Sequence, residues 1–456
     1  MRSHNLHHVL AAPFAPLLIK ELREIVAGRA LWIMLLIMCP LVGYSFFQAL
    51  SLYGESSVAA QQSPALAVSL SPLDGVLVPT FGSLYVAVTL LFPFVAIRTL
   101  SHEKESGSLK LLVQLPYSSG NLVLTKMIAV MVAWLLASFP VVTALIIWGL
   151  LGGHLAPGET FALFLGHALY AALVGAIALF CASITDSAAS AAIVTLAFTI
   201  GSWALDFTIA GRPGILEWFA RLSLTQTIKS FEQGLLALGI VFGMAVAIGG
   251  FLVLAGIWMH PGVFAQQRLR RSLGCLGAVV IGLTVASQIK PAIDTSEDQR
   301  NSFPIADQRA LKTLREQLSV IVHLAPEDPR YMDFRRNILA KLDRAMPFVT
   351  VRLAEDGRPP NIGEDSYGKV EYQYGTRSDA SRSTSYREVL PLIYNLAEIE
   401  PPAPIPGADY PGYPLVANPD LVLPWFFGGL PILIGCAWWW SRRPPSTEFL
   451  TAYKGG

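Results

Sequence analysis

Charged residues are scarce in this chain. Only 14% of its 456 residues are Asp, Glu, Lys or Arg, whereas 53% are hydrophobic and the mean hydropathy is +0.50. This composition argues against an ordinary soluble domain and is typical of a polytopic membrane protein. The formal net charge is only +1, so the overall charge gives no reason to expect nucleic acid as a partner.

Cysteine is equally scarce. The four cysteines are Cys39, Cys181, Cys275 and Cys436, and each lies in or beside an apolar segment. No CxxC pair occurs, which argues against a disulfide framework and a thiolate metal site. The GxxxxGK[ST] pattern is also absent, so the chain has no loop of that kind to cradle nucleotide phosphates. We therefore expect no cofactor and no metal in this chain.

Residues suited to catalysis are sparse as well. The sequence has no HExxH motif and no paired carboxylates inside an apolar segment, so we expect no catalytic residue. His4, His7 and His8 indicate a flexible tail rather than a metal site. His154 and His167 lie near the ends of apolar segments. Histidine inside a membrane is a functional candidate, although interhelical hydrogen bonding is its more frequent role.

Long apolar segments are what the chain does contain. About eight of them are long enough to cross roughly 30 Å of hydrocarbon. In chain order they are residues 30–52, 77–97, 122–151, 161–184, 188–207, 235–259, 273–289 and 421–440. The seventh is the shortest. These segments predict an α-helical polytopic membrane protein.

Lys and Arg are distributed unevenly among the connecting segments. Residues 51–75 and 152–159 have none, whereas the tail before the first span and the loops after the second and sixth are basic, with Lys20, Arg23, Arg29, Arg98, Lys104, Lys110, Arg268, Arg270 and Arg271. By the positive-inside rule, both termini and residues 98–127 face the cytoplasm, and residues 291–418 lie outside.

The segment before the first span, residues 1–29, contains an amphipathic helix. Its apolar residues recur at helical spacing, and the other face is filled by Lys20, Glu21, Arg23 and Glu24. This pattern predicts a helix that lies in the plane of the membrane interface; a plain cytosolic helix is the alternative. A charged helix ahead of the first apolar run also argues against a cleavable signal peptide.

The most polar part of the N-terminal half, residues 98–127, lies between the second and third spans. Two carboxylates precede a Ser-Gly-Ser turn, and an apolar helical run follows it. A short helix held parallel to a membrane by two spans can carry force to a soluble partner, and Glu103 and Glu105 are expected to pair with basic residues there. Within residues 100–120 the candidate coupling residues are His102, Glu103, Lys104, Glu105, Ser106, Gly107, Leu109, Leu112, Leu115 and Pro116.

Residues 208–234, between the fifth and sixth spans, do not form an ordinary loop. Two short apolar pieces, 215–221 and 224–231, are too short to span and too apolar to be fully solvated. We expect a re-entrant hairpin over residues 212–234 that dips into the outer leaflet; a pair of surface helices is the alternative. The candidate outer-gate residues are Trp218, Phe219, Phe231 and Gly234.

These features together resemble the permease subunit of ABC-2-type ABC transporters. The resemblance rests on LLIKELREIVAGRALW, EKESGSLKLLVQLPYSSGNLVLTKMIA and LSLTQTIKSFEQGLLALGIVFGMAVAIGGFLVLAGIWM. It implies an interfacial elbow helix, six spans in residues 30–260, a coupling helix and re-entrant helices. It also implies two copies of a separate ATP-binding subunit that holds ATP and Mg, and a second permease copy that makes a homodimer in a bacterial inner membrane.

Residues 291–418 form the long polar region. We expect helices at 306–317, 333–346 and 386–396 and strands at 318–324, 348–353 and 368–374. Strands separated by helices predict a small α/β fold with some parallel pairing. The stretch from DTSEDQRNSF to VRLAEDG resembles the start of the extracytoplasmic domain of the auxiliary subunit in gliding-motility-type ABC transporters. This resemblance implies a thioredoxin-like fold between two spans, here shortened and, without CxxC, not redox-active.

The sequence thus predicts a six-span permease domain, a basic loop with a seventh span (261–290), an extracytoplasmic α/β domain (291–418), and an eighth span with a tail (419–456). The expected function is that of an ABC transporter permease, an exporter driven by its ATP-binding subunit. The alternative is a scaffold that passes mechanical force to a periplasmic protein bound by the α/β domain. Membrane lipid is a partner in either case.

Overall fold

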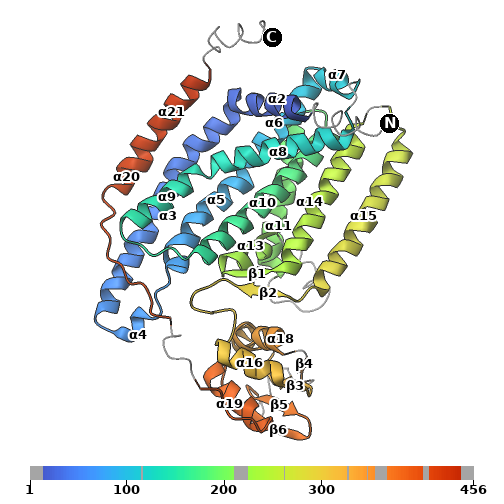
Figure 1. Cartoon of the computed structure of the whole chain (residues 1–456). Helices are drawn as coiled ribbons and strands as arrows, with labels where there is room; N and C mark the ends of the chain where they lie inside the picture. The colour runs from blue at the N-terminus through green and yellow to red at the C-terminus, as the bar shows by residue number, and fades with distance from the viewer. Residues whose placement is uncertain are drawn as a thin grey trace, which may run out of the picture.

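The structure, a computed structural model, describes residues 14–114, 117–209, 224–260, 262–325, 328–346, 348–354, 367–403 and 410–442. A long bundle of helices carries a small α/β domain at one end (Figure 1). In these residues seven helical segments are long and apolar enough to cross a membrane: Arg29–Gln61, Leu73–Glu105, Ser119–Leu150, Pro157–Ile184, Leu238–Met259, Ala265–Gln288 and Val422–Ser441. The predicted fifth span is α11 (Ala188–Ile209), whose apolar part Ala188–Ala204 is shorter. The polytopic fold class is confirmed.

Proline divides the second and third spans into shorter helices. The second span consists of η1 (Leu73–Leu77), α5 (Val78–Leu90) and α6 (Phe92–Glu105), and the third of α8 (Ser119–Ala137) and α9 (Phe139–Leu150). Pro79, Pro93 and Pro140 lie in the first turns of α5, α6 and α9. Proline has no N–H to donate, so the helical hydrogen-bond ladder is interrupted there while the chain keeps its direction.

Helix α10 (Pro157–Ile184) is the centre of the bundle. It packs against α6, α8, α11 and α14 (Leu238–Met259). Its buried face includes Gly166, Ala171, Gly175 and Ala178, and small residues of this kind let neighbouring helices approach closely in a membrane. The first span, α3 (Arg29–Gln61), packs against α5 and α9. We call the end that carries the α/β domain the domain end, and the opposite end the α7 end, after α7 (Ser108–Gln114).

The predicted starts of the sixth and seventh spans were wrong. Residues 235–237 do not begin the sixth span but form β1 (Leu235–Ala237), which pairs antiparallel with β2 (Ala292–Asp294). The sixth span therefore begins at Leu238. The seventh span is α15 (Ala265–Gln288), which begins before residue 273, so Arg268, Arg270 and Arg271 lie in its first turns rather than in a loop.

The α/β domain contains α16 (Ile305–Thr313), β3 (Leu318–Val322), α17 (Pro329–Phe334), η2 (Arg335–Leu339), α18 (Ala340–Ala345), β4 (Val349–Leu353), β5 (Val370–Tyr374), β6 (Arg377–Ser381) and α19 (Tyr386–Leu396). The strand order is β4–β3–β5–β6. Strand β3 is parallel to β4 and antiparallel to β5, which confirms the expected parallel pairing. Strand β6 was not predicted; it follows a tight turn in which Gly375 has a φ of 60°.

The core of this domain lies on one face of the sheet. Leu318, Val320 and Val322 of β3 are buried, and Val320 stands directly opposite the buried Tyr372 of β5. Side chains at alternating positions share one face, so these residues meet the same helices. Phe334, Ile338 and Leu342 cover them from the α17–α18 segment, and Val389 and Ile393 from α19.

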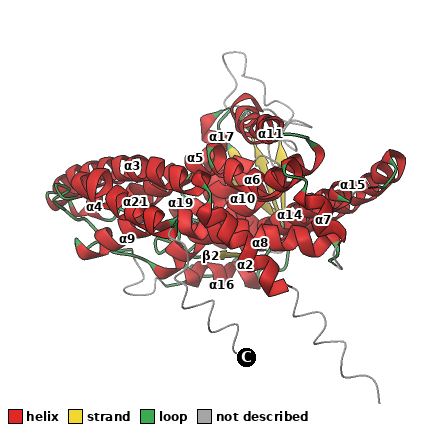
Figure 2. Ribbon diagram, turned by 90° about the horizontal axis from the view of Figure 1, so that it is seen from above, coloured by secondary structure: helices red, strands yellow, loops and turns green. Residues whose placement is uncertain are grey.

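The two spans that flank the α/β domain lie at opposite edges of the bundle (Figures 1 and 2). Helix α15 packs against α14. The last span consists of α20 (Val422–Pro424), η3 (Trp425–Gly429) and α21 (Leu430–Ser441) and packs against α3. The ring centroids of Phe426 and Phe46 are 6.3 Å apart. The returning chain is held at Tyr413, whose carbonyl oxygen accepts a hydrogen bond of 2.6 Å from the Tyr53 hydroxyl.

Charged side chains fix the α/β domain to the domain end of the bundle. Arg300 donates to Asp74 at 2.6 Å and lies 2.7 Å from Asp298. His154, in the loop before α10, lies 2.8 Å from Glu297 and stacks on the ring of Tyr413 at 3.7 Å. These contacts join the domain to η1, at the start of the second span, and to the loop before α10, so it is not held by its own two spans alone.

Gly43 offers a test of how the last span packs on α3. A Cβ atom at Gly43 would lie 2.2 Å from Cβ of Phe426. We expect Gly43→Val to displace the last span and to destabilise the detergent-solubilised chain by about 1–3 kcal/mol, the usual result of overpacking, with partial restoration by Phe426→Gly, which removes the clashing Cβ. Gly54→Val on the same helix is the control, because a Cβ there meets no described atom within 4 Å. Equal thermal unfolding of both glycine variants would contradict this packing.

Candidate functional site

The segment between the second and third spans forms a compact turn at the α7 end. Helix α6 ends at Glu105, Gly107 turns the chain with a φ of 74°, and the short helix α7 follows. The Ser118 hydroxyl then caps α8 by accepting from the N–H of Asn121 at 3.1 Å. Helix α7 packs against α6 at the end of the bundle where α2 (Phe14–Ala27) also lies (Figure 1). The expected short helix between two spans is therefore present.

A buried lysine lies beneath this turn. The side chain of Lys126, in the second turn of α8, is 2% exposed. Its Nζ donates to Glu21 Oε1 at 2.9 Å and to the carbonyl oxygen of Thr99 at 2.7 Å. It also lies 2.7 Å from Glu103 Oε2. Glu103 in turn accepts a hydrogen bond from Lys20 of α2. We call Lys20, Glu21, Glu103 and Lys126 the buried charge cluster.

The buried charge cluster joins three elements that are distant in the sequence. It takes Lys20 and Glu21 from α2, Glu103 from α6 and Lys126 from α8. Removing such charges from water is costly, and only close pairing compensates for it. Losing one partner leaves an uncompensated charge in a medium of low dielectric constant. The cluster therefore holds α2 and the ends of the second and third spans in one fixed arrangement.

The position of Glu21 differs from the prediction. Glu21 was assigned to the polar face of α2, but its side chain is 1% exposed. It lies four residues after Leu17 and four before Ile25, both of which are buried, and residues at this spacing share a helix face. The polar-face assignment was wrong because the partner of Glu21 is a buried lysine from another helix.

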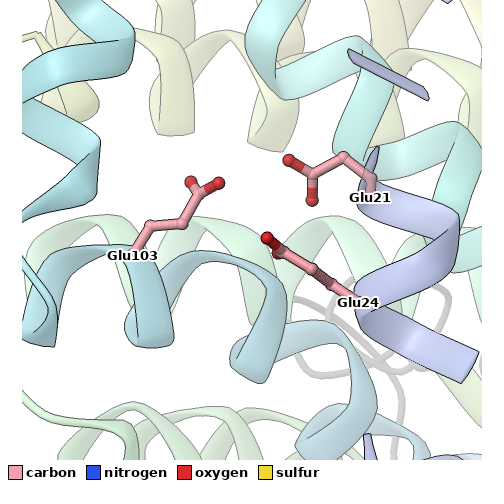
Figure 3. Close-up of side chains that lie close together, drawn as sticks. All are labelled: Glu21, Glu24 and Glu103. Carbon is pink, nitrogen blue, oxygen red and sulfur yellow. The ribbon is translucent and has the colours of Figure 1, made fainter. Parts of the chain in front are cut away.

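The three carboxylates of Glu21, Glu24 and Glu103 lie close together (Figure 3), with one oxygen of each within 4.8 Å of the others. Such a group can hold a cation, but two ammonium groups already lie among them. Lys20 is paired with Glu24 at 3.3 Å as well as with Glu103, and Lys126 pairs with Glu21 and Glu103. Three carboxylates and two ammonium groups leave only one net negative charge, so we assign no metal to the group.

A second anchor follows directly after Glu103. The ammonium group of Lys104 donates to the carbonyl oxygens of Ala182, Ser183 and Thr185 at 2.9, 2.8 and 2.7 Å. These carbonyls lie at the C-terminal end of α10, where a cation is favourable. Glu105 accepts from the backbone N–H of Ala188 at 3.3 Å, at the start of α11. The same turn thus also holds the fourth and fifth spans.

Besides Lys104 and Gly107, which are described above, the predicted coupling residues fall into four groups. Leu109 and Leu112 are half-buried and pack against the bundle, Leu115 and Pro116 lie outside the described residues, and His102, Glu105 and Ser106 are exposed. The prediction that Glu103 pairs with basic residues of a soluble partner was wrong. Its carboxylate is enclosed in the bundle and does not reach such a partner. Leu111, which the sequence did not single out, is 66% exposed on α7.

Two of the predicted outer-gate residues, Phe231 and Gly234, are among the described residues and lie at the domain end. Phe231 of α13 (Leu224–Glu232) is buried, and a Cβ at Gly166 of α10 would lie 2.5 Å from its Cβ. Gly234 has a φ of 73°, and its carbonyl oxygen accepts from the N–H of Thr295 at 2.8 Å. Trp218 and Phe219 lie outside the described residues. Helix α13 confirms the second helical piece of this segment.

Two histidines that the sequence singled out also lie at the domain end. His154 contacts the α/β domain through Glu297, as described above. His167 is fully enclosed in α10, with its ring centroid 5.0 Å from that of Phe81 and its Nε2 3.9 Å from Glu232 Oε1. That distance exceeds a hydrogen bond, so His167 serves here as a packed aromatic ring beside a carboxylate.

Residues 15–209 match the family model of the ABC-2 family transporter proteins. The match begins in α2 and ends with α11, so it includes the buried charge cluster and α7, and it covers less than half of the chain. It supports an ABC-2-type permease, a transmembrane component of an ABC transporter that works with an ATP-binding subunit. No curated protein and no solved structure matches the chain.

Lys126 gives the first test of this site. Lys126→Met would leave Glu21 and Glu103 without their shared partner, and breaking a buried pair of this kind costs about 3–5 kcal/mol. We expect a large fall in the unfolding temperature of the detergent-solubilised chain, followed by tryptophan fluorescence. The matched control is Lys110→Met, since Lys110 is exposed on α7. If both variants unfolded at the same temperature, the buried charge cluster would not stabilise the bundle.

Proposed function

We propose that this chain is the permease subunit of an ABC exporter and that α7 is its coupling helix, which receives the movement of a separate ATP-binding subunit. The observation that carries the proposal is the combination of rigid attachment and exposure at the α7 end. Lys126 and Lys104 tie the turn around α7 to α2 and to the second to fifth spans, while Leu111 remains exposed.

Leu111 is the residue best placed to touch the ATP-binding subunit. An apolar side chain that is exposed on a short helix outside the spans is a natural contact for a groove on a partner. His102, Glu105 and Ser106 are exposed at the end of α6, before α7, and would supply polar contacts at the rim. A push on α7 would tilt the second and third spans together, because the buried charge cluster prevents α6 and α8 from moving separately.

We further propose two ATP-binding subunits and two copies of this chain in the assembly. Each chain provides one α7, whereas an ABC ATPase dimer offers two grooves, so a symmetric homodimer satisfies both. Transport needs a path, and a groove of about 690 Å³ runs along α3 and the η1–α5 segment toward the domain end. Its lining combines apolar residues with Ser45, Gln48 and Ser56, which suits an amphipathic molecule.

The alternative function is mechanical transmission to a partner outside the membrane. It is supported by the attachment of the α/β domain at Asp74 and His154, through which movement of the spans would reach that domain. The order βαβ followed by an antiparallel hairpin and a helix agrees with the thioredoxin-like arrangement that the gliding-motility-type resemblance implies. Without CxxC, such a domain would serve as a docking platform for a periplasmic protein rather than as a redox enzyme.

In both versions the protein resides in a bacterial cytoplasmic membrane. The α7 end and both termini face the cytoplasm, and the α/β domain faces the periplasm, because the short connections 51–75 and 152–159 at the domain end contain no Lys or Arg, whereas the short connections at the α7 end are basic.

Leu111→Asp tests the coupling role of α7. A buried partner contact would gain an unpaired charge, so we expect copurification of the ATP-binding subunit to fall at least about tenfold, with unchanged thermal unfolding of the permease. Leu66→Asp is the control, because Leu66 is an exposed leucine of α4 (Pro64–Ala67) at the domain end. Undiminished copurification of Leu111→Asp would remove α7 from the interface.

Thiol labelling tests the orientation. In a background with all four cysteines replaced by alanine, a cysteine at Thr376, in the turn between β5 and β6, should react with an impermeant maleimide in spheroplasts. A cysteine at Ser106 should react only after permeabilisation. Both positions are exposed, so access to the membrane side decides the result. The reverse order would overturn the orientation and the coupling role together.

A further inference from the structure

A cavity of about 340 Å³ lies between the α/β domain and the β1–β2 ribbon. Its volume is at the lower end of the range for small-ligand sites. Three cationic side chains line it: Lys312 from α16, and Lys341 and Arg344 from α18. The other polar residues of the lining are Asp294, Ser296, Gln299, Asn301, Ser302 and Gln308.

The lining has a surplus of positive charge. Its one carboxylate, Asp294, already accepts hydrogen bonds from Ser296, Asn301 and Ser302. Three cations and one carboxylate leave two net positive charges. The neighbouring carboxylates are also paired: Asp343 lies 3.0 Å from Lys290, and Asp298 lies 2.7 Å from Arg300.

The two cations of α18 are held in place. The Lys341 ammonium lies 5.8 and 5.7 Å from the ring centroids of Phe303 and Tyr386 and donates to the carbonyl oxygen of Ser302 at 3.1 Å. Arg344 donates to the carbonyl oxygen of Asn301. Burial lowers the pKa of Lys341 and of Arg344 from their ordinary values. A buried cation of this kind gains from a nearby anion.

The cavity lies at the level of the membrane surface. Helix α14 has 22 residues, which corresponds to about 33 Å and matches the hydrocarbon thickness of roughly 30 Å. Its first residue, Leu238, therefore lies at one hydrocarbon boundary. The β1 strand immediately before it contributes Leu235 to the cavity, and β2 contributes Ala292 and Asp294. This is the depth of phospholipid headgroups.

We propose that this cavity binds a phosphate group, carried by a phospholipid headgroup or present as free phosphate. Arginine and lysine are the side chains that proteins use for phosphate, because the planar guanidinium donates two parallel hydrogen bonds and the ammonium adds a compact charge. With a headgroup bound, the α/β domain is anchored to the lipid surface as well as to the spans.

The test compares two double variants of the purified full-length chain. Lys312→Gln/Arg344→Gln removes two cations from the cavity, and Arg309→Gln/Arg377→Gln removes the same charge from the same domain away from it. One arm measures phosphatidylglycerol retained after detergent exchange by native mass spectrometry. The other titrates inorganic phosphate into lipid-depleted protein by calorimetry. We expect the cavity variant to bind about tenfold more weakly than the control, as for loss of a charge-assisted hydrogen bond.

Each outcome is decisive. Weakening in the lipid arm assigns the site to a headgroup, and weakening in the phosphate arm alone assigns it to free phosphate. Unchanged binding in both arms, or equal weakening in the control variant, overturns the proposal. If Arg344→Gln lowers the unfolding temperature, Lys312→Glu replaces the double variant, because Lys312 is exposed and its charge reversal spares the fold. Lys312→Glu must then weaken the binding of phosphatidylglycerol or of phosphate, or the proposal fails.

Discussion

The ammonium group of Lys126 determines how one end of the bundle is assembled. It has three protons, and its three close partners are Glu21, Glu103 and the carbonyl oxygen of Thr99. Its charge is tolerable in a buried position only while these partners remain in place. Helix α2 and the ends of α6 and α8 therefore behave as one body, and Lys104 extends that body to α10. A force applied to α7 reaches most of the permease at once.

Charge pairs hold the elements together at the two ends of the bundle, whereas small side chains allow close helix packing in its middle. Around α10, Gly166 and Gly175 allow the helices to approach closely. At the domain end, Arg300 connects the α/β domain to η1 of the second span, and His154 connects it to the loop before α10. In a membrane, close packing drives the association of helices. Charge pairs outside the hydrocarbon then determine which helices and domains contact each other. Under the proposed mechanical function, this division would let the spans carry movement from α7 to the α/β domain.

Sequence patterns predicted the helices and strands better than the contacts between them. Hydropathy identified the spans, and alternation and helical spacing identified β3 and the α17–α18 segment, because these signals are local. The pairing of Glu21 with Lys126 joins residues 105 positions apart. A glutamate within the apolar stripe of α2 was its only local sign. The pairing of β1 with β2 is hidden in the same way, since residues 235–237 are as apolar as the span that follows. Exposure of Leu111 depends on how α7 is rotated, which hydropathy does not specify.

The placement of α15 and α21 at opposite edges of the bundle has a consequence for assembly. An auxiliary domain made as a separate protein would associate with its permease by mass action, and a fraction would dissociate at low expression. Here the α/β domain is covalently tethered on both sides, and its effective concentration at the permease is set by the chain itself. Its ratio to the permease is fixed at synthesis and does not vary with expression. The domain therefore needs only modest contacts to remain in place, which leaves its other surfaces free for evolutionary change.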